Sequence, residues 1–212
     1  LKGSAIMIFG SLWVNIVNYV YHIVMGRILG PADYGELMSL YAILYVVSVV
    51  PLSTSFAIVK EISHTKNKKE RSVVYHTLKR YLWRLAVVSS LILIFLSPFI
   101  ARFLHIENVF SVGIIGSVLF FMLILLGNQA TLQGVLDFFG VVASNLASST
   151  VKLIFGVILV LLGFSVSGAI AAILLAVIAS YIVSARMVRR YVSARPSKKK
   201  IPLVPFLRYA FP

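Results

Sequence analysis

Long apolar stretches alternate along the chain with short polar or basic segments. Each stretch exceeds the length of about 20 apolar residues that an α-helix needs to cross the hydrocarbon core of a bilayer. The pattern predicts six transmembrane helices, at residues 4–29, 31–59, 76–104, 109–136, 139–163 and 166–190. The expected fold class is therefore all-α, a polytopic membrane helix bundle.

The composition favours an integral membrane protein over a soluble one. Of the 212 residues, 60% are hydrophobic and 12% are charged, whereas about 25% of an average soluble domain is charged. So few charged side chains cannot cover the surface of a water-soluble globule of this size. The lack of cysteine in the sequence also excludes a disulfide framework and a thiolate metal site.

The net charge of +14 is explained by membrane topology, without a nucleic-acid partner. Lysine and arginine cluster at 60–84, between the second and third predicted helices, and at 186–208, after the sixth. Arg27 and Arg102 are expected on the opposite side of the membrane. Because cytoplasmic loops carry an excess of Lys and Arg, both termini are expected in the cytoplasm of a multi-pass protein of the cell membrane.

The end of the chain predicts three parts. Residues 1–192 are expected to form one six-helix lobe, and 193–206 a basic cytoplasmic linker. The apolar and aromatic segment 207–212 has the composition of the start of a seventh helix. The chain is therefore expected to be the N-terminal lobe of a two-lobe transporter. The alternative is a complete six-helix protein with a ragged tail.

The first predicted helix has a polar face. Ser11, Asn15, Asn18, His22 and Gly26 recur at spacings of three or four residues, which places them on one side of a helix. Amide and imidazole groups that face hydrocarbon lack hydrogen-bond partners. This face therefore either bonds to neighbouring helices or lines a wet cavity.

The connection between the first two helices predicts a tight turn. Gly30 can adopt the positive φ that ends a helix, and Pro31 suits the first turn of the next one. Asp33 falls in that turn, where the helix dipole favours an anion. Arg27, just before the turn, is either an interfacial anchor or a cation that attracts anions to a cavity mouth.

Polar stripes also mark the fourth and fifth helices. Gln129, Gln133 and Asp137 recur every four residues toward the expected cytoplasmic end of the fourth. They are either interfacial or line a cavity mouth where they bind sugar hydroxyls. Asn145 and Ser148 begin a similar face on the fifth helix, which continues to a lysine.

Lys152 is the most informative residue of the chain because it falls near the middle of the fifth predicted helix. A lysine at the bilayer centre costs about 2.5–3.5 kcal/mol on insertion scales. All six acidic residues of the sequence lie near the ends of predicted helices, so none is an obvious partner. Three explanations remain open: an anionic ligand in a wet cavity, a carboxylate from another lobe, or a neutral buried amine.

Motifs of enzymes are missing from the sequence. It contains no His-x-x-x-His pair, no Gly-x-Ser-x-Gly turn and no Gly-x-x-x-x-Gly-Lys phosphate loop. We therefore expect no catalytic residues, no metal site and no cofactor.

Four segments resemble the polysaccharide-biosynthesis flippases of the multidrug/oligosaccharidyl-lipid/polysaccharide exporter superfamily. The segments are Gly26-Arg-Ile-Leu-Gly-Pro-Ala-Asp-Tyr-Gly35, Ala57-Ile-Val-Lys-Glu-Ile-Ser63, Thr131-Leu-Gln-Gly134 and Leu207-Arg-Tyr-Ala-Phe-Pro212. The resemblance implies a protein of 12 to 14 helices in two lobes around a central cavity. It also implies a glycan on a polyprenyl (pyro)phosphate as the cargo, which favours the anionic ligand as the partner of Lys152.

Three functions are consistent with these observations. The first is a flippase for a lipid-linked oligosaccharide, the second a drug or metabolite exporter of the same superfamily. The third is a non-transporting membrane scaffold for glycosyltransferase or polymerase partners. Besides the glycan substrate, the partners expected are membrane lipid and a C-terminal lobe of the same chain. The residues expected to bind substrate are Lys152, Arg27, Asn15, Asn18, His22, Gln129, Gln133, Asn145 and Ser148.

Overall fold

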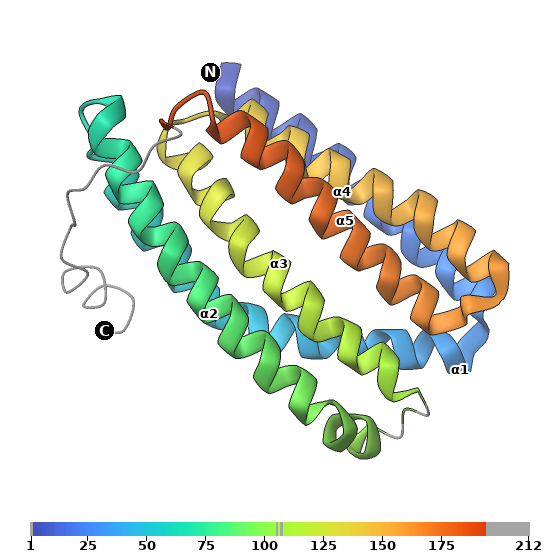
Figure 1. Ribbon diagram of the computed structural model, residues 1–212. Coiled ribbons are helices and arrows are strands. Elements are labelled where there is room, and N and C mark those ends of the chain that lie inside the picture. Colours follow the sequence, from blue (N-terminus) through green and yellow to red (C-terminus); the bar gives the residue numbers. More distant parts are fainter. Residues whose placement is uncertain (1, 105, 107, 194–212) are drawn as a thin grey trace.

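A computed structural model describes residues 2–104, 106 and 108–193, without the side chains of residues 2, 4 and 49–53. The described chain is all-α, as predicted (Figure 1). Its elements are α1 (Lys2–Ser63), α2 (Lys68–Phe103), α3 (Val109–Gly134), α4 (Phe138–Leu159), the π-helical turn η1 (Val160–Phe164) and α5 (Ser165–Val188). The predicted linker at 193–206, apart from Ser193, and the predicted helix start at 207–212 lie outside the described residues.

The described residues contain four segments long and apolar enough to cross a membrane, where the sequence predicts six. They are Ala5–Ser48, Lys68–Phe103, Val109–Gly134 and Phe138–Val188. The difference arises because no polar loop separates the first predicted helix from the second, or the fifth from the sixth. The count of six crossings stays a prediction.

Glycines break both of the longest apolar segments. Gly30, inside α1, has φ 76° and ψ 175°, a region of backbone conformation that is essentially restricted to glycine. Gly163, inside η1, has φ 91°. Figure 1 shows the chain reversing direction at the Gly30 break and again between α4 and α5. Each long segment is therefore a hairpin of two helices that a single turn joins.

Short polar side chains cap α2, α3 and α4, each of which follows a non-helical connection. Asn67 accepts a hydrogen bond from the Glu70 amide at 2.9 Å and begins α2, and Asn108 caps α3 in the same way. Asp137 accepts from the Gly140 amide at 3.0 Å and caps α4. Asp137 thus satisfies backbone donors at a helix start, which explains its position at the end of the α3 polar stripe.

A buried polar network joins three helices. The Tyr75 hydroxyl of α2 donates to Oδ1 of Asn128 on α3 at 2.8 Å. The Asn128 amide donates to Oγ of Ser184 on α5 at 3.2 Å. Asn128 is 1% exposed, and such bonds between helices hold a membrane bundle together where the solvent offers no hydrophobic driving force.

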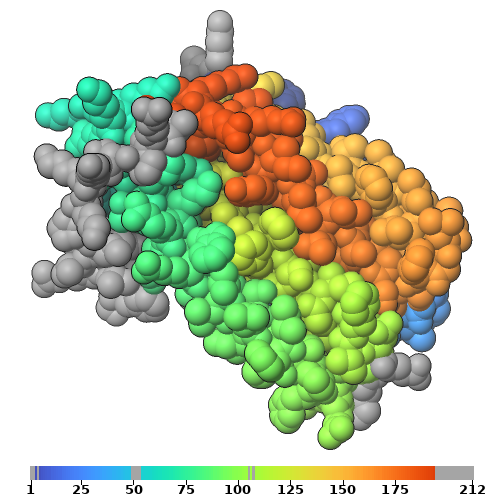
Figure 2. All heavy atoms as spheres, viewed as in Figure 1, coloured from blue at the N-terminus to red at the C-terminus, as the bar shows by residue number. Residues whose placement is uncertain are grey.

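Large apolar side chains cover the outside of the bundle. Phe9, Trp13, Phe95, Phe99 and Phe110 are all largely exposed. Figure 2 shows one face of the molecule, on which α2, α3, α5 and α4 lie side by side in that order. An apolar exterior of this extent is expected where helices face lipid rather than water.

Candidate substrate-binding cavity

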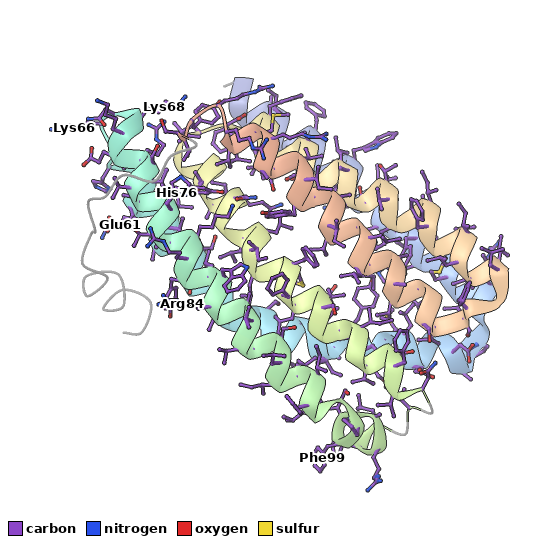
Figure 3. All side chains as sticks on the ribbon, viewed as in Figure 1. Glu61, Lys66, Lys68, His76, Arg84 and Phe99 are labelled. Atoms are coloured by element: carbon purple, nitrogen blue, oxygen red, sulfur yellow. The ribbon has the colours of Figure 1, made fainter. Side chains whose placement is uncertain are left out.

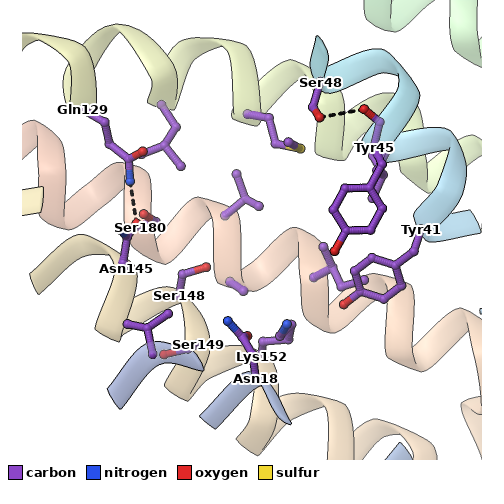
Figure 4. Close-up of a pocket in the computed structure, with 17 residues that line it drawn as sticks. Asn18, Tyr41, Tyr45, Ser48, Gln129, Asn145, Ser148, Ser149, Lys152 and Ser180 are labelled. Carbon is purple, nitrogen blue, oxygen red and sulfur yellow. Dashed lines mark hydrogen bonds between the residues drawn. The ribbon is translucent and has the colours of Figure 1, made fainter. Parts of the chain in front are cut away.

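A cavity of about 340 Å³ lies between α1, α3, α4 and α5 (Figure 4). Gln129 of α3, the polar face of α4 and both halves of α1 face it. Its lining consists of Val14, Asn18, Tyr41, Leu44, Tyr45, Ser48, Met122, Leu125, Gln129, Asn145, Ser148, Ser149, Lys152, Ile173, Ala176, Val177 and Ser180.

Lys152 of α4 reaches the cavity wall with its ammonium group against aromatic rings. Its Nζ atom lies 4.5 Å from the ring centroid of Tyr21 and 5.9 Å from that of Tyr41. Among the described lining residues there is no Asp or Glu. A ring face attracts a cation but leaves its charge unneutralised, so a protonated Lys152 would give the cavity wall a net positive charge at this point.

Tyr21 is held in place by close packing with α4. Its side chain is 0% exposed, and a Cβ atom placed on Gly156 would lie 2.8 Å from the Tyr21 ring. Because glycine has no side chain, Gly156 leaves room for the Tyr21 ring, which lies beneath Lys152. The hydroxyls of Tyr21 and Tyr41 are both buried.

An amide pair forms another part of the wall. Nε2 of Gln129 on α3 donates to Oδ1 of Asn145 on α4 at 2.7 Å and also lies 3.3 Å from Oγ of Ser144. Figure 4 shows this bond at the edge of the cavity, with Ser148 on the next turn of α4 toward Lys152. The bond leaves the Gln129 side-chain carbonyl as an acceptor and the Asn145 side-chain amino group as a donor for a ligand.

The structure brings five of the predicted substrate-binding residues together in this cavity. They are Asn18, Gln129, Asn145, Ser148 and Lys152.

The other four do not line the cavity. His22 bonds to the Tyr34 hydroxyl through Nδ1 at 3.2 Å and packs edge-on against Tyr21. Asn15 and Arg27 are exposed, the latter near the Gly30 break, and Gln133 is half-buried one turn beyond Gln129. In the first half of α1, Asn18 therefore lines the cavity and Asn15 faces away from it.

Compared with models of known families, residues 1–212 match the family described as polysaccharide biosynthesis protein. The chain belongs to the polysaccharide biosynthesis protein family. The match spans the whole sequence and confirms the predicted resemblance to a polysaccharide biosynthesis family, whereas flippase activity and the superfamily stay predictions. No curated protein and no solved structure matches the chain.

Membership of the polysaccharide biosynthesis family supports a role in making polysaccharide, and the apolar helices support a membrane location. Within this family member the cavity is the place where polar groups from four helices converge. It combines one cation, several hydroxyls and amides, and two tyrosine rings. Such a lining can bind an anion together with a hydroxyl-rich ligand.

Sequence reasoning missed the tyrosines of the cavity. Tyr41, Tyr45 and Ser48 line it from the second half of α1, and the rings of Tyr41 and Tyr45 lie 6.2 Å apart between centroids. Their spacing of four and three residues is a helical stripe that the sequence contains. Tyrosine at this spacing is equally typical of packed helix faces, so only the neighbouring helices reveal that these side chains meet a cavity.

Proposed function

We propose that this chain forms a lobe of a flippase that moves a polyprenyl-(pyro)phosphate-linked oligosaccharide across the cytoplasmic membrane by alternating access. The observation that carries the proposal is Lys152 in a cavity whose described lining contains no carboxylate. An ammonium group in that position requires a counter-ion, and a cargo phosphate supplies one.

The energetics of the cargo support the same assignment. A phosphate loses hydration when it enters a medium of low dielectric constant, and a nearby cation offsets part of that cost. The remaining Asn18, Asn145 and Ser148 groups are donors for phosphate oxygens or sugar hydroxyls. One lysine provides attraction without a dense cluster of cations, which would hold the cargo too tightly for release.

The proposed topology has six crossings, with both ends of this lobe in the cytoplasm. The breaks at Gly30 and Gly163 support division of each long apolar segment into two crossings. The loop after α1, the α3–α4 turn and the end of α5 gather at one end of the bundle (Figure 1). This end includes the basic residues around 66–71 and 186–190, as expected for the cytoplasmic side.

A small-molecule exporter is the second candidate function. The cavity volume of about 340 Å³ is at the lower end of the range for small-ligand pockets, about 300–1,000 Å³. The tyrosine rings at Tyr41 and Tyr45 would also suit an aromatic solute. The flippase is favoured because the lining is cationic, whereas a cationic solute would require an acid.

Substitution of Lys152 tests the flippase. Transport of lipid-linked glycan into vesicles is measured together with the amount of protein in the membrane. Lys152→Met should reduce transport by roughly 10-fold to 100-fold, because a hydrogen bond to a charged group contributes about 1.5–3 kcal/mol. Lys152→Glu should reduce it further, and Lys152→Arg should retain part of it since the charge remains.

Lys66→Met is the matched control, because Lys66 is exposed and does not line the cavity. It should transport at the normal rate. Normal glycan transport by well-inserted Lys152→Met would remove Lys152 from cargo binding. Loss of export of a small solute, with glycan transport unaffected, would favour the exporter instead.

A further inference from the structure

A second hollow, separate from the cavity, lies on α2. Its volume is about 410 Å³, and it is lined by His76, Lys79, Arg80, Trp83 and Arg84. These positions recur at the spacing of neighbours on one helix face. We call this set the α2 basic face.

The cations of the α2 basic face are not neutralised by the described protein. Lys79 lies 5.7 Å from the ring centroid of Tyr75, and no carboxylate of the described residues pairs with Lys79, Arg80 or Arg84. The sole acid of α2 is Glu70, close to the first residue of the helix, where its amide bonds to the Asn67 cap. The guanidinium groups therefore retain their donors for an external anion.

One edge of the hollow is fixed by the chain after α5. His76 donates from Nε2 to the carbonyl of Ser193 at 3.0 Å, and the Ser193 amide donates to Oγ of Ser72 at 2.7 Å. These two bonds hold the His76 end of the basic face against the end of the bundle. Arg84, at the other end, projects from the outer side of α2, away from α3 (Figure 3).

The α2 basic face lies where α2 changes from charged to apolar. No charged residue occurs in 85–101, directly after Arg84. Trp83 is 52% exposed, and exposed tryptophan beside arginine is typical of the boundary between headgroups and hydrocarbon. The phosphates of a phospholipid leaflet are therefore expected at the level of these cations.

An exposed apolar stripe continues the Arg84 side of α2 toward the expected hydrocarbon. It contains Val88, Leu91, Ile92, Phe95 and Phe99, with Phe95 81% exposed. Starting from Arg84, these residues follow at helical spacing. Arg80 and Arg84 followed by the stripe have the polarity of one lipid molecule, with its head at the guanidinium groups and its acyl chains on the stripe.

We propose that the α2 basic face binds the phosphate of an anionic phospholipid whose acyl chains lie on this stripe. The planar guanidinium groups of Arg80 and Arg84 bind phosphate oxygens through paired N–H donors, and Lys79 adds a point charge. Basic pockets on the cytoplasmic side of membrane helices bind anionic headgroups in this way. The bound lipid would anchor α2 at a fixed depth, independently of the cargo in the cavity.

Fluorescence quenching of Trp83 by brominated lipid tests the proposal. In the full-length protein, all tryptophans except Trp83 are replaced by phenylalanine. The protein is then placed in vesicles of phosphatidylcholine and phosphatidylglycerol. Bromine is placed on one lipid or the other at the same mole fraction. Brominated phosphatidylglycerol should quench Trp83 more strongly than brominated phosphatidylcholine, because each cation contributes on the order of a fivefold preference, or about 1 kcal/mol.

The variant Lys79→Gln/Arg80→Gln/Arg84→Gln should lose this excess quenching. Its quenching by brominated phosphatidylcholine should be unchanged, which shows that Trp83 still faces lipid. The matched control Lys66→Gln/Lys68→Gln/Lys69→Gln removes the same charge from exposed positions and should keep the excess.

Three results would overturn the proposal. If both brominated lipids quench Trp83 equally in the protein with an intact α2 basic face, this face does not select phosphatidylglycerol over phosphatidylcholine. An equal loss in the control variant means that the charge acts diffusely over this end of the bundle. Removal of the excess by inorganic phosphate at constant ionic strength would assign the α2 basic face to soluble phosphate.

Discussion

Gly156→Ala tests the packing that positions Lys152. A Cβ atom at Gly156 would lie 2.8 Å from the Tyr21 ring, whereas ordinary contacts between carbon atoms are about 3.5–4.0 Å. The ring must therefore move, yet Tyr21 is fully buried. Overpacking of this kind costs about 1–3 kcal/mol. Replacement of glycine by alanine inside a helix gains up to about 1 kcal/mol in return.

Gly113→Ala isolates the clash, because Gly113 is also helical and nothing lies within 4 Å of its Cβ position. It should share the helix-propensity gain without the overpacking. We expect the free energy of unfolding of Gly156→Ala to be lower than that of Gly113→Ala by about 1–3 kcal/mol. The measurement is unfolding in mixed micelles of detergent and sodium dodecyl sulfate, monitored by circular dichroism.

Transport provides the second readout for Gly156→Ala. The Tyr21 ring lies beneath the Lys152 ammonium at 4.5 Å, so its displacement should move the charge and slow glycan transport at equal protein level. Gly113→Ala should transport normally. If the two variants unfold at the same free energy and transport equally, the ring has room to move and the structural reasoning about this contact fails.

Three further predictions concern other parts of the bundle. Tyr75→Phe should lower the free energy of unfolding by about 0.6–1.7 kcal/mol, and a double-mutant cycle with Asn128→Ala should recover this coupling; an additive cycle would contradict the bond. Gly30→Ala should cost about 1–3 kcal/mol through its backbone alone, whereas Gly35→Ala, also in open space, should not; equal unfolding would refute the strain. A cysteine at Lys68 should react with an impermeant maleimide only in broken cells, and labelling of intact cells would reverse the topology.

The helices and their breaks were largely predictable from the sequence. Gly30 followed by Pro31 indicates the end of one helix and the start of another by local conformation alone, and the structure has its break at Gly30. The number of crossings could not be confirmed in the same way. A tight glycine turn leaves no polar loop, so apolar length alone merges the two helices of each hairpin.

The cavity was predictable only as a set of helix faces. The stripe that contains Asn145, Ser148 and Lys152 follows from their spacing, and all three line the cavity. The rotation of one helix against another depends on contacts such as Tyr21 with Gly156, which are far apart in sequence. For that reason, the sequence could not show which amides of the first helix reach the cavity.

The Gly30 turn has a consequence for genetics. Nothing lies within 4 Å of a Cβ atom at Gly30, so a side chain there would strain its own backbone and collide with no neighbour. A damaging change at Gly156 can in principle be suppressed by a second mutation that shrinks Tyr21. A damaging change at Gly30 has no such neighbour to shrink. In a selection for restored growth, we therefore expect Gly30 mutants to yield reversions to glycine, and Gly156 mutants to yield second-site suppressors as well.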